Sequence, residues 1–146
     1  MKKLSMNLRN YLFALVLLPT LALGQSIKVI VNESNPLESI NRTEVADYFM
    51  KRNKQWPDGA PVRFFDRNDD SRERMSFLRE VLKKSQREIE TFWIGQKLYT
   101  GHSAPTQVSS DSMMAALVAR FPGAIGYVSD EFAGGKGVKV IELKGN

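Results

Sequence analysis

The sequence predicts one mixed α/β domain preceded by a targeting segment, and three observations support this prediction. Short β-branched runs alternate with stretches whose apolar residues recur at helical spacing. The chain has 146 residues, 42% hydrophobic and 25% charged, which excludes a disordered chain and fits a single core. It contains no cysteine and one histidine, which excludes disulfide frameworks, thiol catalysis, thiolate zinc sites and multi-histidine metal centres.

Residues 1–24 have the pattern of a secretory signal peptide. Three basic residues and no acidic one accompany an apolar run over residues 11–23, and small residues before Gln25 fit a cleavage site. The run is too short for a spanning helix, which needs about 20 apolar residues. The lack of cysteine also excludes a lipid-anchored lipoprotein. We therefore expect an exported, periplasmic protein of residues 25–146 that is not membrane-anchored.

The basic character of the whole chain comes largely from that segment. The 21 basic and 16 acidic residues give a net charge of +5, but residues 1–24 hold three of the basic residues. Residues 25–146 therefore carry 18 basic against 16 acidic residues, a net charge of +2. Nucleic-acid binding depends on a clear excess of cations, so we expect no nucleic-acid partner.

The elements predicted for the first half of residues 25–146 follow from β-branched runs, caps and turns. A strand over 27–31 closes at an Asn-Pro turn, and a helix begins at Asn41, three residues before Glu44, the spacing of a capping box. A Pro-Asp-Gly turn at 57–59 precedes a strand over 62–65. A helix then runs from about residue 70 to 84, with a buried stripe of Met75, Leu78, Val81 and Leu82.

The second half continues the alternation. Ser85 and Glu88 form another capping box, and the helix that they begin ends near Gly101. The next helix begins near Ser110 and stops at a Pro-Gly pair, with an apolar face of Met114, Leu117, Val118 and Phe121. Strands over 124–128 and 138–143 end the chain, around a glycine-rich hairpin turn at 134–137. Because helices separate the strands, we expect crossover connections in a mixed sheet flanked by helices.

No catalytic or metal-binding pattern is complete in this sequence. His102 lies in a loop-like segment, and no G-x-S-x-G motif is present, so a Ser-His-Asp enzyme is not indicated. The acidic run 66–70 hints at a calcium loop, but Ser71 and Phe77 stand where glycine and glutamate are required. We therefore expect no enzyme activity, no metal and no cofactor, while the role of His102 stays open.

Oxyanion binding at a helix start is the chemistry that remains. The strand over 62–65 leads into a helix whose first backbone N–H groups favour an anion, and Ser71 adds a hydroxyl. Arg67 and Arg74 can each pair with two phosphate oxygens. In the alternative, Asp69, Asp70 or Ser71 caps the helix and no ligand is needed.

The order strand, R-x-D-x-S-x-x-R, helix resembles a segment of the phosphate-binding protein of the phosphate ABC transporter, a type II periplasmic binding protein. Arg67, Asp69, Ser71 and Arg74 match that segment, and the stretch PGAIGYV over 122–128 is similar to a second, more specific one. The resemblance implies a single α/β lobe over residues 25–146. It also implies that those four residues bind phosphate, with Asp69 accepting its proton, and that a transporter membrane component is the partner.

Two departures from the family bear on the ligand. The family has two lobes and this chain supplies about one, so a partner or a second copy would have to provide the missing wall. Asp70, Arg72 and Glu73 replace the family's glycines and threonine, and a carboxylate about 4 Å from a phosphate costs roughly 4 kcal/mol at an effective dielectric of 20. We therefore expect weak or partner-dependent binding of phosphate or a similar oxyanion. The alternative is a ligand-free module that reuses the lobe to recognise a protein partner.

Overall fold

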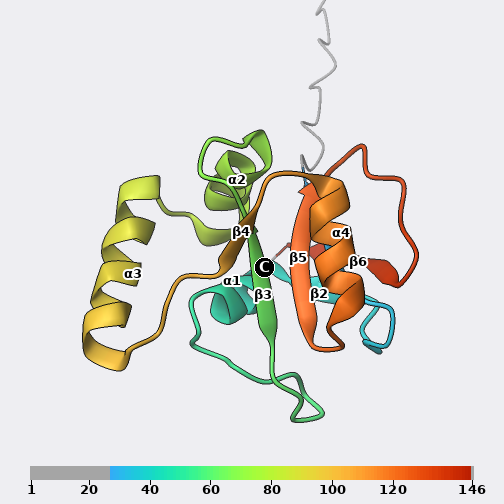
Figure 1. The fold of residues 1–146 in the computed structure, drawn as a ribbon, viewed down its shortest axis with the longest axis horizontal. Helices are drawn as coiled ribbons and strands as arrows, with labels where there is room; N and C mark the ends of the chain where they lie inside the picture. The colour runs from blue at the N-terminus through green and yellow to red at the C-terminus, as the bar shows by residue number, and fades with distance from the viewer. Residues whose placement is uncertain (1–26, 146) are drawn as a thin grey trace, which may run out of the picture.

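Residues 27–145, which the computed structural model describes, form a six-stranded mixed sheet with helices on both faces (Figure 1). The strands lie in the order β2-β6-β1-β5-β3-β4. Their bounds are β1 (Ile27–Asn32), β2 (Ser39–Asn41), β3 (Arg63–Arg67), β4 (Thr106–Val108), β5 (Ala124–Ser129) and β6 (Val138–Lys144). The mixed α/β architecture is the one that the sequence predicts, whereas the expected signal peptide over residues 1–24 lies outside the described residues.

Strand direction sets β1 apart from the rest of the sheet. It pairs antiparallel with both of its neighbours, β5 and β6. The other pairings, β2 with β6 and β3 with both β4 and β5, are parallel. The parallel pairs require the crossover connections that the sequence predicts, since parallel strands cannot be joined by a tight turn. One consequence is that β3, β4 and β5 end at the same edge of the sheet.

The helices begin where the sequence places their caps. They are α1 (Arg42–Phe49), α2 (Arg72–Phe77), α3 (Gln86–Thr100) and α4 (Asp111–Arg120), and α2 continues into the π-helical turn η1 (Leu78–Leu82). The capping box at the start of α3 is confirmed: the Ser85 hydroxyl accepts from the Glu88 amide at 3.2 Å, and the Glu88 carboxylate accepts from the Ser85 amide at 2.7 Å. Gly101 ends α3 with a φ of 74°, a conformation that favours glycine.

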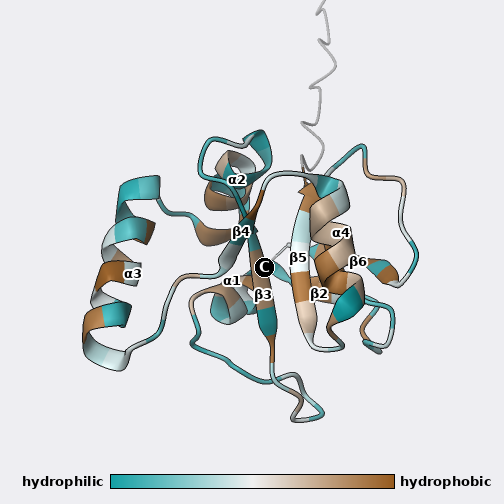
Figure 2. Ribbon diagram, viewed as in Figure 1, coloured by the Kyte–Doolittle hydropathy of each residue, from teal (hydrophilic) through white to brown (hydrophobic). Residues whose placement is uncertain are grey.

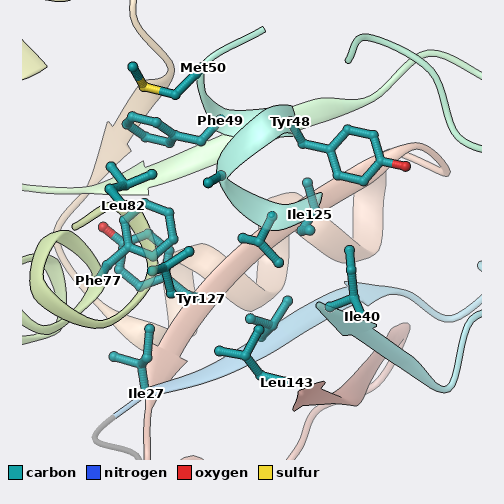
Figure 3. Close-up of a cluster of buried hydrophobic side chains, with 14 of the residues drawn as sticks. Ile27, Ile40, Tyr48, Phe49, Met50, Phe77, Leu82, Ile125, Tyr127 and Leu143 are labelled. Atoms are coloured by element: carbon teal, nitrogen blue, oxygen red, sulfur yellow. The ribbon is translucent and has the colours of Figure 1, made fainter. Parts of the chain in front are cut away.

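Both faces of the sheet are buried. On one face, alternate residues of β1 pack with α1, η1 and α3 around Phe49, Phe77 and Tyr127 (Figure 3). On the other face Ile30 packs with Phe65 and with residues of α4. Each large aliphatic or aromatic side chain buried in this way stabilises the fold by about 1.5–3 kcal/mol. The two clusters together hold the ends of β3, β4 and β5 in fixed positions.

Several sequence predictions are wrong in detail. The strands β5 and β6 do not form a hairpin, because β1 lies between them. Met75 is 54% exposed and Phe77 is buried in its place, since α2 begins only at Arg72 and turns that face inward. The predicted helix to residue 84 ends earlier, at Lys83, which has a φ of 55°. The strands β2 and β4, three residues each, were not predicted.

Candidate functional site

The four candidate ligands lie around the end of β3 and the start of α2. Arg67 is the last residue of β3, and Ser71 is the N-cap of α2, where its hydroxyl accepts from the Arg74 amide at 3.1 Å. Asp69 lies in the turn between them and is exposed. The segment lies at the edge where β3, β4 and β5 end, and Ser109, which follows β4, and Asp111, the first residue of α4, contact it.

Arg67 is 5% exposed, and its guanidinium contacts two carboxylates. One Nη bonds to Asp111. The other lies 3.3 Å from Glu73 Oε2 and 3.4 Å from the carbonyl oxygen of Ser109. Its Nε is buried without a hydrogen-bond partner among the described residues. The guanidinium N–H groups of Arg67 that could donate to an oxyanion are therefore largely bonded to groups of the protein itself.

Arg74 is still more enclosed, at 3% exposure. Its Nη1 pairs with the buried carboxylate of Asp66, and its Nε lies 3.0 Å from Asp69 Oδ1 and 3.1 Å from Gln86 Oε1. The Asp66 carboxylate also accepts from the Arg67 amide at 2.8 Å and from the Tyr127 hydroxyl. Asp66 thus links β3, β5 and α2, and it satisfies the buried guanidinium with a full negative charge.

The pKa values of the cluster follow from burial and from these partners. Burial raises the pKa of the Tyr127 hydroxyl, which stays protonated as the donor to Asp66. Burial also lowers the pKa of Arg74. For Asp111 burial alone would raise the pKa, but hydrogen bonds from the Ser129 hydroxyl and amide and from Arg67 hold it below its ordinary value. Asp111 is therefore charged and already bonded.

The structure brings the four predicted residues together, and it surrounds them with groups that sequence reasoning missed. Two guanidinium groups face the four carboxylates of Asp66, Asp69, Glu73 and Asp111, a net charge of −2. The sequence indicated Tyr127 only as part of the family-like stretch over 122–128. In the structure its hydroxyl donates a hydrogen bond to the Asp66 carboxylate. Asp111 lies 44 residues from Arg67 in the sequence, and no local pattern links the two.

The other candidate chemistries find no support in the part of the chain that the structure describes. No group of three or more His, Asp or Glu side chains within residues 27–145 is arranged to hold a metal ion. Over the same range no helix combines the length and the apolar character needed to cross a membrane. His102 lies in the connection between α3 and β4, well along the chain from the arginine cluster.

A mixed sheet with one reversed strand and helices on both faces matches one lobe of a substrate-binding protein of the phosphate-receptor type. Three solved structures share this fold. The ABC-type phosphate transport receptor of Vibrio cholerae is 22% identical with a TM-score of 0.60, over 81% of this chain and 46% of that one. PstS from Borrelia burgdorferi is 16% identical with a TM-score of 0.64, over 82% and 47%.

The third structure is a putative phosphate ABC transporter substrate-binding protein from Clostridium perfringens with bound phosphate. It is 19% identical, with a TM-score of 0.61, and the match covers 81% of this chain and 44% of that one. No protein-family model matches this chain, and no curated protein matches it in sequence. The chain thus spans less than half the length of these solved proteins, and at 16–22% identity the likeness establishes the fold.

Proposed function

We propose that this chain is an exported, non-enzymatic binding-protein lobe that recognises a protein partner and does not capture free phosphate. The pairing of both buried arginines with carboxylates carries this proposal. A phosphate at this place would meet a net charge of −2, and each carboxylate about 4 Å away would repel it by roughly 4 kcal/mol at an effective dielectric of 20. A helix N-terminus stabilises a bound anion by only about 0.3–1 kcal/mol, so the repulsion from the carboxylates outweighs this stabilisation.

The proposed compartment is the periplasm. This part of the proposal rests on the signal-peptide pattern of residues 1–24 and on the near-neutral composition of residues 25–146. A tagged full-length chain should be recovered from the periplasmic fraction in a processed form that begins at Gln25. Recovery of the unprocessed chain from the cytoplasm would contradict export.

The surface best suited to a protein partner is that of α3, which projects from the body of the molecule (Figures 1 and 2) and whose residues Ile94 and Leu98 line the groove beside it. Three large side chains on it are exposed, Ile94 at 63%, Leu98 at 76% and Tyr99 at 89%. A groove of about 640 Å³ separates this helix from β4, the edge strand of the sheet. Single exposed apolar residues are ordinary, but three on one helix beside a groove indicate an interaction surface.

An extended segment of the partner fits this groove by strand addition. The Val108 carbonyl accepts from the Asn68 amide at 3.1 Å and so faces inward. Because successive residues of a strand point their backbone groups to opposite sides, the amide and carbonyl of Gln107 face outward into the groove that Gln107 lines. Such an edge pairs with an extended chain, and an apolar helix face beside it accepts alternate side chains.

Photocrosslinking from α3 tests the interaction directly. A photoreactive amino acid at Leu98 should link the chain to one defined protein, whereas the same group at Lys136, in the exposed turn before β6, should not. The linked peptide, mapped by mass spectrometry, should be an extended apolar segment. Equal crosslinking from both positions, or none from Leu98 in cells that produce the chain, would contradict a partner on α3.

Phosphate binding linked to ABC-transporter uptake is the second candidate function. Its support is the fold shared with phosphate receptors, one of them solved with bound phosphate, and the unpartnered Nε of Arg67. Under this proposal Arg67, Asp69, Ser71 and Arg74 are the ligands, and phosphate displaces the Glu73 carboxylate, which lies at the long distance of 3.3 Å. Binding would then be weak, or would need a second wall from a partner or another copy.

Glu73→Gln separates the two candidates. The substitution removes the competing charge beside Arg67 and keeps the size of the side chain. Phosphate at 100 times its Kd stabilises a protein by about 2.7 kcal/mol, several degrees in Tm for a domain of this size. The protein-partner proposal predicts that millimolar phosphate shifts the Tm of Glu73→Gln no more than that of the wild type. A shift in the wild type that grows in Glu73→Gln would establish the phosphate candidate instead.

A further inference from the structure

A second hollow of the surface, away from the arginine cluster, gathers positive charge. It has a volume of about 430 Å³ and lies against the first half of β3, between the loop that follows α1 and the connection from α3 to β4. In Figure 1 the start of the loop after α1 and the connection from α3 to β4 lie on the same side of β3. The strand β4 pairs only with Phe65–Arg67, so the first residues of β3 leave room beside them. The volume lies within the usual range for small-molecule sites.

Three cationic or protonatable side chains line this pocket. Lys51 and Lys54 come from the loop after α1, and His102 comes from the connection before β4. Within residues 27–145 these three side chains form no ion pair, whereas Arg52, in the same loop, pairs with Asp47 at 2.7 Å. The Lys51 ammonium lies 6.0 Å from the centroid of the Trp93 ring. The two lysines of this loop that form no ion pair within the described residues, Lys51 and Lys54, therefore both line the pocket.

The remaining lining is polar or apolar and carries no compensating negative charge. None of the described residues that line the pocket is an aspartate or a glutamate. Val62, Phe64 and Pro105 supply apolar wall. Arg63 also borders the pocket, but its guanidinium lies 3.8 Å from the centroid of the Phe121 ring, which does not line it. Positive groups that share a hollow without counter-charges raise each other's energy, and a bound anion relieves that repulsion.

We propose that this pocket, bounded by Lys51, Lys54 and His102, binds a small organic anion, a phosphate or carboxylate group carried on a compact apolar body. The two ammonium groups hold the acid group, and the wall of Val62, Phe64 and Pro105 contacts the apolar body. The imidazole of His102 donates to the anion when it is protonated. This proposal does not depend on the protein-partner function, because neither α3 nor the arginine cluster supplies the ligands.

The protonation behaviour of His102 agrees with this geometry. Burial and the charges of Lys54 and Lys51 lower its pKa from the ordinary value of 6.5. Lys97 adds positive charge nearby, since its ammonium bonds to the Ser103 hydroxyl at 3.2 Å. The guanidinium of Arg63 lies over the Phe121 ring, at the border of the pocket. An anion among these groups favours the imidazolium, so its binding should raise the pKa of His102.

The site is distinct from the arginine cluster. Arg63 begins β3 and Arg67 ends it, and four residues of extended chain span about 13 Å. The cluster at the end of β3 is filled by four carboxylates, whereas none lines this pocket. Any effect of a small anion on the protein can therefore be assigned by substitutions at one end of β3 or the other.

His102 is the chain's one histidine, so its imidazole gives a single set of NMR signals whose titration reports on the pocket. Phenyl phosphate should raise the pKa of His102 saturably, and phenol, which has the same ring without the charge, should not. Inorganic phosphate should act more weakly than phenyl phosphate, because it lacks the apolar body. An unchanged titration with phenyl phosphate, an equal effect of phenol, or equal binding of the two phosphates would overturn the proposal.

Two substitutions make the test specific. Lys51→Gly removes a charge at a residue with a φ of 56°, a conformation that glycine adopts freely, so the substitution should leave the fold intact. Combined with Lys54→Gln, it should weaken phenyl phosphate at least tenfold and raise the pKa of His102 in the free protein. Lys144→Gln, on β6, which two strands separate from β3, is the control and should bind as the wild type does. Undiminished binding in the double variant would refute the assigned ligands.

Discussion

Replacing Asp66 by asparagine removes the negative charge that faces Arg74 while keeping the size of the side chain. Asp66 is 2% exposed, and its carboxylate accepts from Arg74, from the Arg67 amide and from the Tyr127 hydroxyl. The amide of an asparagine can accept from some of these donors but cannot neutralise a buried guanidinium. Arg74, at 3% exposure, would then keep as its ion-pair partner Asp69, whose side chain is 56% exposed.

The expected loss follows from the burial of the pair. Removing one partner of a buried ion pair costs about 3–5 kcal/mol, because the remaining charge is left uncompensated. For a domain of this size that loss lowers Tm by roughly 10–20 °C. The matched control is Asp47→Asn, which breaks the pair with Arg52 at the surface, where the two side chains are 35% and 54% exposed. A surface pair contributes about 0–1 kcal/mol.

Urea unfolding followed by circular dichroism measures both variants. Asp66→Asn should lower the free energy of unfolding by several times the effect of Asp47→Asn. Tyr127→Phe, which removes one of three donors to Asp66, should lie between them at about 1 kcal/mol. If Asp66→Asn cost no more than Asp47→Asn, the cluster would not brace the fold, and the assignment of Arg74 as a structural rather than a ligand-binding residue would be refuted.

Three further predictions concern a close contact, a backbone conformation and a titration. Gly123→Ala should destabilise the fold by about 1–3 kcal/mol in urea unfolding, because a Cβ there would lie 2.1 Å from the Pro61 carbonyl oxygen. Lys83→Gly should stabilise it by about 0.5 kcal/mol in the same assay, because the φ of 55° strains a side-chain-bearing residue. The pKa of Asp111 is lower in the folded state, so the unfolded state binds more protons below about pH 4 and stability falls there as the pH drops. Asp111→Asn should reduce the fall in the free energy of unfolding below about pH 4. An unchanged dependence on pH would contradict the assignment.

Local chemistry was predictable from the sequence, and pairing between distant segments was not. The caps at Asn41 and Ser85 were found because each depends on residues three positions apart. The hairpin of β5 and β6 was wrong because a strand from the opposite end of the chain inserts between them. The edge strand β4 was missed because it has only three residues, two exposed and one buried, which are too few to show an apolar alternation.

The same division holds for the candidate sites. The residues 66–74 displayed their excess of acidic groups in the sequence, and that excess was the basis for expecting weak phosphate binding. Which carboxylate pairs with which arginine depends on the approach of α4, which brings in Asp111. The pocket of Lys51, Lys54 and His102 joins two connections that are about fifty residues apart, so its charge could be seen only after folding.

The central position of β1 has a consequence for when the chain can fold. Among the strands of residues 27–145 it is the first to be synthesised, yet both of its neighbours, β5 and β6, lie beyond residue 123. Until those residues leave the ribosome, β1 has no strand to pair with on either edge, and closing a loop of this length is slow. A chain shortened before β5 would therefore leave β1 unpaired, and folding of this sheet has to wait until β5 and β6 have been synthesised.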